Sequence, residues 1–281
     1  MHFGINTFLF TSPFTNKNTR LFRQFKAWGF DGVEIVVENP TDIDPAFVRS
    51  QLDRHGLICT SICGCFPTSR DLRGTKTQQR ASINYLKRLV DMAGILGTDI
   101  IMGPVYSAVG RAEAVSRTAY QSQWRTVRGH LQTICAYAEA KGKMICLEPL
   151  NRFETDFLNT VEQGLQLIRE VGSPALKLGL DTFHMNIEEK NPAAAIRRAG
   201  RHLGHFHASA NDRGTPGNDH VDWRGAAGAL QDIRYDGAVV IESFTPEVKV
   251  IARAAAIWRK IEPCNDDIAR KGVAFLKKTF K

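Results

Sequence analysis

The chain has 281 residues, of which 43% are hydrophobic and 23% are charged, a composition typical of soluble globular proteins. No apolar run approaches the ~18 residues of a membrane-spanning helix, so an integral membrane protein is not expected. The formal net charge of +8 is dispersed, with local groups only at Arg197–His202 and near the C-terminus. Neither group has the interleaved aromatic residues that stack on bases, so we expect no nucleic-acid partner.

Eight short segments with the character of β-strands recur along the chain. They are His2–Phe10, Gly32–Glu38, Leu57–Cys65, Thr98–Tyr106, Lys143–Leu150, Leu176–Phe183, Leu203–Ser209 and Gly237–Phe244. Segments with helical periodicity lie between them, including Thr19–Trp28, Pro45–His55, Gln78–Leu96, Trp124–Lys141 and Thr160–Val171. Several helices are expected to end at a glycine just before the next strand, where glycine forms a left-handed cap. Strand and helix thus alternate along the whole chain.

This alternation predicts the fold class. Near-continuous apolar strands joined by helices are typical of a parallel sheet that is covered on its faces. Eight such units in a chain of this length predict an α/β fold, a single-domain (β/α)8 TIM barrel over residues 1–281. An open doubly wound sheet is the alternative, but no glycine-rich phosphate loop follows the first strand. The long connections Tyr106–Gln123 and Asn211–Asp222 are expected at the C-terminal ends of strands, as candidate lids.

The cysteines and the first residues bear on cellular location. No CxxC pair occurs among the six cysteines, and five of them lie in apolar segments, which is typical of free thiols. The first ten residues lack a basic leader and already have the pattern of a strand. We therefore expect a cytoplasmic protein with reduced thiols.

A metal-capable side chain stands at or near the end of each of four consecutive predicted strands. These residues are Glu148, Asp181, His207 and Glu242. His205 has the same strand parity as His207, so periodicity does not choose between these two. A lone glutamate at a strand end is usually a cap or an ion-pair partner, but the C-terminal ends of barrel strands converge on one rim. The four together therefore indicate one shared site.

Three carboxylates held together would repel one another unless a cation lay between them. A set of oxygen ligands with one imidazole suits Mn²⁺, Co²⁺ or Mg²⁺ better than a structural zinc, which favours sulfur and nitrogen. We expect Mn²⁺, because imidazole is a less usual ligand for Mg²⁺.

Four motifs in order resemble the ketose 3-epimerases, the D-tagatose and D-psicose (allulose) 3-epimerase family of xylose-isomerase-like TIM barrels. They are "EPLNRFETDFLNT", "LDTFHMNIEE", "GHFHASANDRGTPG" and "VVIESF". The resemblance implies a divalent metal, commonly manganese, at Glu148, Asp181, His207 and Glu242, and so selects His207 over His205. It also implies that Glu154, His184 and Arg213 bind the oxygens of a ketose, and that the protein is a homodimer or homotetramer.

The sequence departs from the family pattern at four positions. Ser209 and Ala210 stand where the family usually has a Gly-Glu pair. Asn6 and Phe14 stand where related enzymes often have larger aromatic residues. These differences leave the expected metal ligands in place and bear on sugar preference.

The expected reaction is inversion at C3 of a free ketohexose or ketopentose, such as D-tagatose, D-psicose, D-fructose or ribulose. Glu148 and Glu242 would act on opposite faces of C3, one removing a proton while the other returns one. An aldose–ketose isomerase of the same fold is one alternative, and a non-catalytic sugar-binding barrel is another. An endonuclease IV-like AP-site nuclease is disfavoured, since it needs many histidine ligands and the eight histidines lie mostly away from the strand ends.

Overall fold

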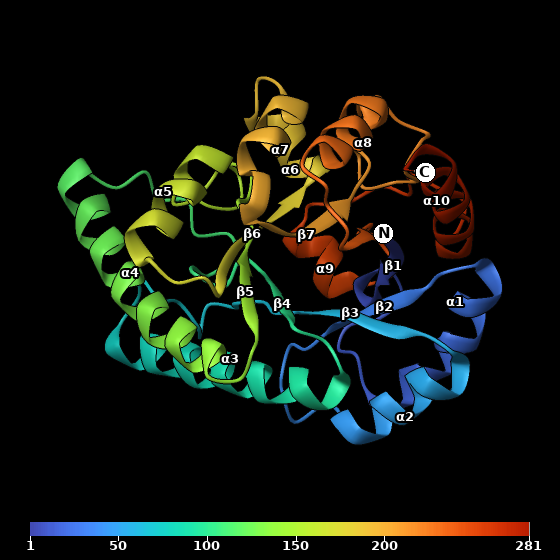
Figure 1. Cartoon of the computed structure of the whole chain (residues 1–281), viewed down its shortest axis with the longest axis horizontal. Helices are drawn as coiled ribbons and strands as arrows, with labels where there is room; N and C mark the ends of the chain where they lie inside the picture. Colours follow the sequence, from blue (N-terminus) through green and yellow to red (C-terminus); the bar gives the residue numbers. More distant parts are fainter. Residues whose placement is uncertain (281) are drawn as a thin grey trace.

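The computed structural model describes residues 1–280, and its eight parallel strands form a closed barrel in chain order (Figure 1). The strands are β1 (His2–Asn6), β2 (Gly32–Val36), β3 (Ile58–Cys63), β4 (Ile100–Gly103), β5 (Met144–Leu147), β6 (Leu176–Asp181), β7 (Leu203–Ala208) and β8 (Ala238–Ile241). Strand β1 pairs with β8, with Ile5 opposite Ile241, and this pairing closes the barrel. The predicted (β/α)8 TIM barrel is therefore confirmed.

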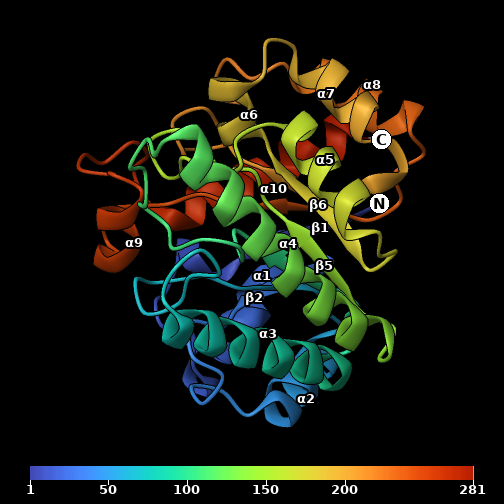
Figure 2. The same cartoon turned by 90° about the vertical axis from the view of Figure 1, so that its left-hand side faces the viewer.

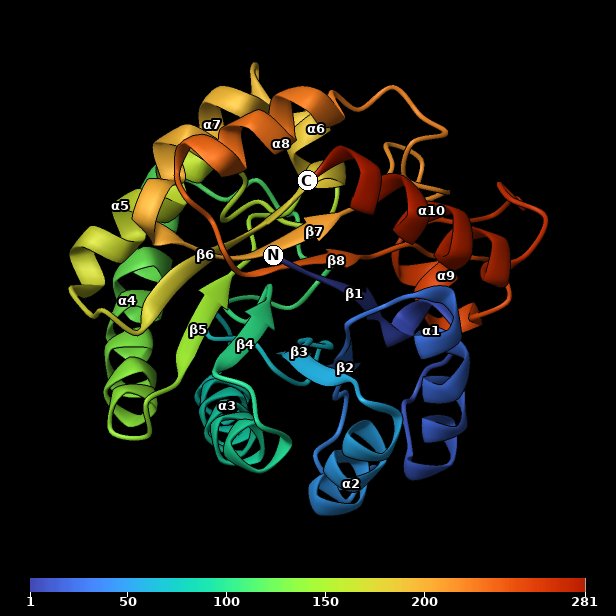
Figure 3. The same ribbon diagram turned by 45° about the vertical axis from the view of Figure 1, so that its right-hand side comes forward.

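Helices cover the outside of the barrel (Figure 3). The α-helices of residues 1–280 are α1 (Phe22–Trp28), α2 (Pro45–His55), α3 (Lys76–Leu96), α4 (Arg117–Glu139), α5 (Val161–Val171), α6 (Thr182–Glu188), α7 (Pro192–Ala199), α8 (Trp223–Asp232), α9 (Lys249–Ala254) and α10 (Asn265–Thr279). Three 3₁₀ helices are η1 (Thr7–Leu9), η2 (Asn16–Leu21) and η3 (Gly200–His202). The short helix α9 lies outside the helical ring, at one end of the molecule (Figure 2).

Local sequence sets the ends of helices α2 and α3. The side chain of Asp44 accepts hydrogen bonds from two N–H groups in the first turn of α2, and Pro45 occupies the position where a missing N–H costs nothing. Thr75 forms a reciprocal capping box with Gln78 at the start of α3. Both helices end at a glycine with positive φ, as the sequence predicts, since that backbone region disfavours other residues.

The core lies between the barrel and the helices. Each long helix turns an apolar face toward the strands, and the side chains on that face are almost fully buried. Examples are Phe25 of α1, Leu89 of α3, Leu131 of α4, Leu167 of α5 and Ile196 of α7. Burial of each such side chain stabilises the fold by roughly 1.5–3 kcal/mol. This packing fixes the strands, and with them the residues at the C-terminal ends of the strands.

All eight observed strands are shorter than predicted, and helix α4 begins earlier than predicted. The first strand ends at Asn6, because its side chain caps the 3₁₀ helix η1. The sixth strand ends at Asp181, whose side chain accepts a hydrogen bond from the N–H of Phe183 and so starts α6. The candidate lid Tyr106–Gln123 is partly helical, since α4 begins at Arg117, whereas Asn211–Asp222 contains neither helix nor strand.

Within residues 1–280, no helix has both the length and the apolar character that crossing a membrane requires.

Candidate active site and metal centre

Four side chains from neighbouring strands meet at the C-terminal end of the barrel. Glu148 follows β5, Asp181 ends β6, His207 lies in β7 and Glu242 follows β8. Each offers one ligand atom, and the four atoms all lie within 4.8 Å of one another. The register of the sheet contributes to this arrangement, because Asp181 and His207 are direct partners across β6 and β7. The structure thus brings together the four residues that the sequence singles out as metal ligands.

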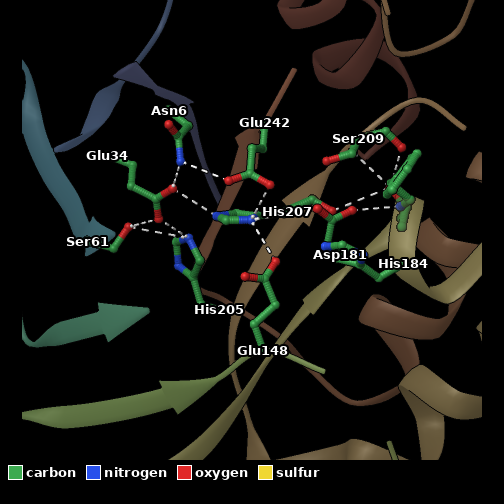
Figure 4. A network of polar contacts seen from close by, with 12 residues as sticks. Asn6, Glu34, Ser61, Glu148, Asp181, His184, His205, His207, Ser209 and Glu242 are labelled. Atoms are coloured by element: carbon green, nitrogen blue, oxygen red, sulfur yellow. Dashed lines mark hydrogen bonds and ion pairs between the residues drawn. The ribbon is translucent and has the colours of Figure 1, made fainter. Parts of the chain in front are cut away.

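His207 stands at the middle of the group, with its two ring nitrogens facing opposite ways (Figure 4). Its Nε2 atom lies 2.8 Å from Oε1 of Glu34, deeper in the barrel. Its Nδ1 atom lies 3.4 Å from Oε1 of Glu148, 3.4 Å from Oε2 of Glu242 and 4.0 Å from Oδ2 of Asp181. The Nδ1 atom therefore faces the three carboxylates.

Two buried polar atoms at this centre have no hydrogen-bond partner among the residues that the structure describes. They are Nδ1 of His207 and Oε1 of Glu148. Buried polar atoms without partners are costly, so their presence at one centre points to a missing ligand. One imidazole nitrogen and three carboxylates form a donor set that fits Mn²⁺, Co²⁺ or Mg²⁺. The residues present therefore fit a divalent cation.

Charges at the centre shift the pKa values of its ligands. Burial, together with the negative charges of Glu242 and Asp181, raises the pKa of Glu148 to about 8. Burial lowers the pKa of His207, but the carboxylates of Glu34, Glu242 and Glu148 outweigh it and raise this pKa well above its ordinary value. Burial raises the pKa of Asp181, but the positive charge of Arg213, with smaller contributions from His184 and His207, outweighs it, so the net shift is downward. Protons thus partly neutralise the negative charge of the centre.

Arg213 lies beside the same carboxylates. Its Nη1 atom donates to Oδ2 of Asp181 at 2.6 Å and to Oε2 of Glu242 at 3.0 Å. The guanidinium lies over the rings of Phe183 and Phe244, at 4.1 and 4.6 Å from their centroids. The backbone of Arg213 has a φ of 64°, a left-handed conformation that is uncommon for a residue other than glycine. The loop after β7 therefore holds the buried guanidinium of Arg213 at the site, and the backbone of Arg213 is in a costly conformation.

His184 and Glu154 complete the set that the sequence resemblance points to. Nδ1 of His184 accepts a hydrogen bond from the backbone N–H of Asn151 at 3.1 Å. Burial lowers the pKa of His184 to about 4, so the neutral ring carries its proton on Nε2 at pH 7. That N–H lies 3.2 Å from Nη2 of Arg213, which is also a donor. Two adjacent donors that cannot bond to each other make a site for an acceptor oxygen.

A cavity of about 550 Å³ opens above the centre. Its polar lining includes Glu148, Glu154, His184, Arg213 and Glu242. Much of the remaining wall is apolar and includes Phe8, Phe66, Pro67, Leu150, Phe244, Val250 and Ile251. The cavity therefore combines a few acids and donors with largely apolar walls, which suits a small ligand held by a small number of polar contacts.

The four positions that depart from the family pattern lie in different surroundings. Asn6 is buried and bonds to both Glu34 and Glu242. Phe14 is buried and stacks on Phe22, and it is not part of the cavity wall. Ser209 accepts a hydrogen bond from Arg213 at 3.0 Å, and Ala210 is fully buried.

Sequence reasoning missed the polar residues beneath the metal-ligand group. Glu34, Ser61 and His205 are fully buried inside the barrel and are joined by hydrogen bonds or ion-pair contacts. One feature of the sequence does point to Glu34, since it is the only charged residue in the apolar run "GVEIVV". Charged residues are rarely buried without a specific partner.

Comparison with known proteins places the chain in a family. A family model described as xylose isomerase-like TIM barrel matches residues 22–279. The chain belongs to this family of barrels.

Its relatives define the group more narrowly. The chain is 38% identical to a probable ketose 3-epimerase of Synechocystis sp., over 99% of this chain and 96% of that protein. It is 32% identical to a D-psicose 3-epimerase of Agrobacterium fabrum, over 88% of each protein. A crystal structure of D-allulose 3-epimerase from Methylomonas sp. in complex with D-allulose superposes with a TM-score of 0.92 at 29% identity, covering 99% of this chain and 97% of that chain. Within the family, the chain is a member of the ketose 3-epimerases, which are carbohydrate isomerases.

Proposed function

We propose that this protein is a divalent-metal-dependent ketose 3-epimerase that inverts C3 of free ketohexoses and ketopentoses, with D-tagatose, D-psicose, D-fructose and ribulose as candidate substrates. One observation carries the proposal: four ligand atoms lie within 4.8 Å of one another, two of them are buried without hydrogen-bond partners, and two of the four residues, Glu148 and Glu242, line the cavity. The relatives named above support the same reaction.

The ligands proposed for the cation are Glu148, Asp181, His207 and Glu242. Mn²⁺ is the first choice, and Co²⁺ and Mg²⁺ suit the same donors. When bound, the cation would supply Lewis-acid polarisation of substrate oxygens and offset the negative charge of the three carboxylates.

Proton transfer is assigned to Glu148 and Glu242. Both line the cavity, and they approach the centre from strands β5 and β8. The C3–H of a ketose is a weak acid, so one carboxylate must remove this proton while the enediolate that forms is stabilised. The other glutamate then returns a proton on the opposite face of C3. The two residues exchange roles when the reaction runs in the other direction.

Substrate positioning is assigned to Glu154, His184 and Arg213. The adjacent N–H groups of His184 and Arg213 would donate to a ketose oxygen on which negative charge develops. The carboxylate of Glu154 is held by the side-chain amide of Asn151 at 2.8 Å and would accept from a sugar hydroxyl. These contacts fix the sugar so that C3 lies between the two glutamates.

The same proposal includes a cytoplasmic location and a homodimeric or homotetrameric state. The six cysteines are all unpaired, which supports a reducing compartment. Light scattering on the purified protein tests the oligomeric state.

The direct test is a panel of ketopentoses and ketohexoses, assayed after chelation and again after addition of Mn²⁺. The proposal expects C3 epimers that form only when metal is restored. Aldose products would instead indicate an aldose–ketose isomerase. Saturable binding of ketoses without turnover in the presence of Mn²⁺ would indicate a sugar-binding barrel.

A further inference from the structure

Glu34 is a fully buried carboxylate in the interior of the barrel, beneath the metal-ligand group (Figure 4). Strand register places Glu34 of β2 between two polar residues, since Asn6 of β1 and Ser61 of β3 are its direct cross-strand partners. Two histidines of β7, His205 and His207, reach it from across the barrel. Every neighbour in this set presents a donor to the carboxylate.

The two oxygens of Glu34 share four partners. Oε1 accepts from Nδ2 of Asn6 at 2.6 Å and lies 2.8 Å from Nε2 of His207. Oε2 accepts from Oγ of Ser61 at 2.5 Å and lies 2.8 Å from Nε2 of His205. A carboxylate only accepts hydrogen bonds, so the Nε2 atoms of both histidines carry protons.

This arrangement decides which nitrogen of His207 is free to bind a cation. When a cation is bound, the remaining ring proton stays on Nε2, where Glu34 accepts it, and Nδ1 offers its lone pair; Nδ1 is the atom that faces Glu148 and Glu242 at 3.4 Å. A carboxylate that receives the second ring N–H of a histidine ligand fixes its tautomer and ring orientation.

Asn6 extends the control of Glu34 to a second residue of the centre. The same Nδ2 group that bonds to Glu34 lies 3.2 Å from Oε1 of Glu242. The orientation of the amide is fixed, because Oδ1 of Asn6 accepts the backbone N–H of Phe8 at 2.8 Å. With Oε1 of Glu242 held by Asn6, Oε2 faces Nδ1 of His207.

We propose that Glu34 is a positioning residue of the active site, which sets His207 as the Nε2-protonated tautomer and, through Asn6, orients Glu242 with Oε2 toward the centre. This inference rests on the proposed function, because it concerns ligands of the proposed cation. A structural role alone would require only that the carboxylate be satisfied. Here one partner of Glu34, His207, belongs to the metal-ligand group, and a second partner, Asn6, contacts another member of the group, Glu242.

The first experiment measures the Mn²⁺ dissociation constant by competition with a chelator, in the wild-type protein and in Glu34→Gln. An amide at position 34 cannot accept all four hydrogen bonds, so we expect affinity to fall about 10- to 100-fold. Ser61→Ala is the matched control: it removes one donor from the other oxygen of Glu34 and leaves the His207 contact, and we expect a change below about 3-fold. Wild-type affinity in folded Glu34→Gln would overturn the inference, whereas absence of Mn²⁺ binding by the wild type would overturn the proposed function instead.

The second experiment needs no substitution at Glu34, so it stays decisive if that variant does not fold. Nitrogen-15 NMR of labelled histidines in the Mg²⁺-loaded wild type reads the tautomer of His207, and we expect the proton on Nε2. A proton on Nδ1 would refute the inference.

A third measurement addresses the Asn6 arm. In Asn6→Ala at saturating Mn²⁺, we expect kcat to fall about 10-fold or more with KM little changed, because Glu242 loses its fixed orientation. An unchanged kcat would remove Asn6 from the proposal.

Discussion

Binding of Mn²⁺ at neutral pH should displace about two protons from the protein, because metal ligands must be deprotonated. The pKa of His207 lies well above its ordinary value, so this ring is protonated at pH 7 in the metal-free protein. The pKa of Glu148 is about 8, so roughly nine tenths of this carboxyl group is also protonated at pH 7. Both shifts are upward and the cation binds the deprotonated forms, so affinity must rise with pH.

The magnitude follows from the number of protons displaced. Two protons correspond to an increase of about 100-fold in the apparent association constant between pH 6 and pH 7. Above the pKa of Glu148, at about 8, this carboxyl group no longer releases a proton on metal binding, so the slope should become smaller.

Titration calorimetry in buffers of different ionisation enthalpy counts these protons directly. In Glu148→Gln the number released at pH 7 should fall by about one, since the amide does not titrate. A wild-type value below about half a proton at pH 7 would refute the assigned charge state of the centre.

Three further predictions concern catalysis and stability. Glu148→Gln and Glu242→Gln should each lower kcat by about 10²–10⁴-fold and abolish exchange of the C3 proton with solvent, and normal exchange in both would exclude the two-glutamate assignment. Removal of Mn²⁺ from protein held at 100 times Kd should cost about 2.7 kcal/mol and lower Tm by about 5 °C or more, as calorimetry would show. Burial raises the pKa of Asp156, but its hydrogen bond from Arg73 at 2.6 Å outweighs this and lowers it below the ordinary 3.8. The bond therefore adds stability above about pH 4 that is lost as pH falls through the lower folded-state pKa, so Asp156→Asn should destabilise the fold at pH 7, and this effect should diminish as pH falls below about 4 in denaturant titrations.

The barrel could be predicted from sequence because its determinants are local. Apolar strands, helical periodicity and capping residues each act within a few positions, and Pro45–His55 was predicted with the bounds that the structure gives. Two of the errors in strand bounds occur where a side chain caps the next helix. Asn6 and Asp181 both cap a following helix, and the hydrophobic pattern does not reveal such a hydrogen bond.

Glu148, Asp181, His207 and Glu242 could be named because each stands at or near the end of a strand, where barrel geometry gathers them, whereas Glu154, His184 and Arg213 were named only from the family resemblance. The layer beneath could not be named in this way. Its members come from strands β1, β2, β3 and β7, and their contact depends on the register between strands. A shift of one residue in β2 would turn Glu34 out of the barrel, and periodicity alone does not determine register.

The buried polar layer explains why the centre can hold so many charges without distorting the barrel. Glu34 would be strongly destabilising in an apolar interior, but four partners satisfy both of its oxygens within 2.8 Å. The layer is carried by paired strands, whereas part of the cavity wall comes from helix α9, outside the helical ring. The four proposed ligands of the cation therefore stand on or directly after paired strands, whereas part of the cavity wall stands on a segment outside the barrel and its helical ring.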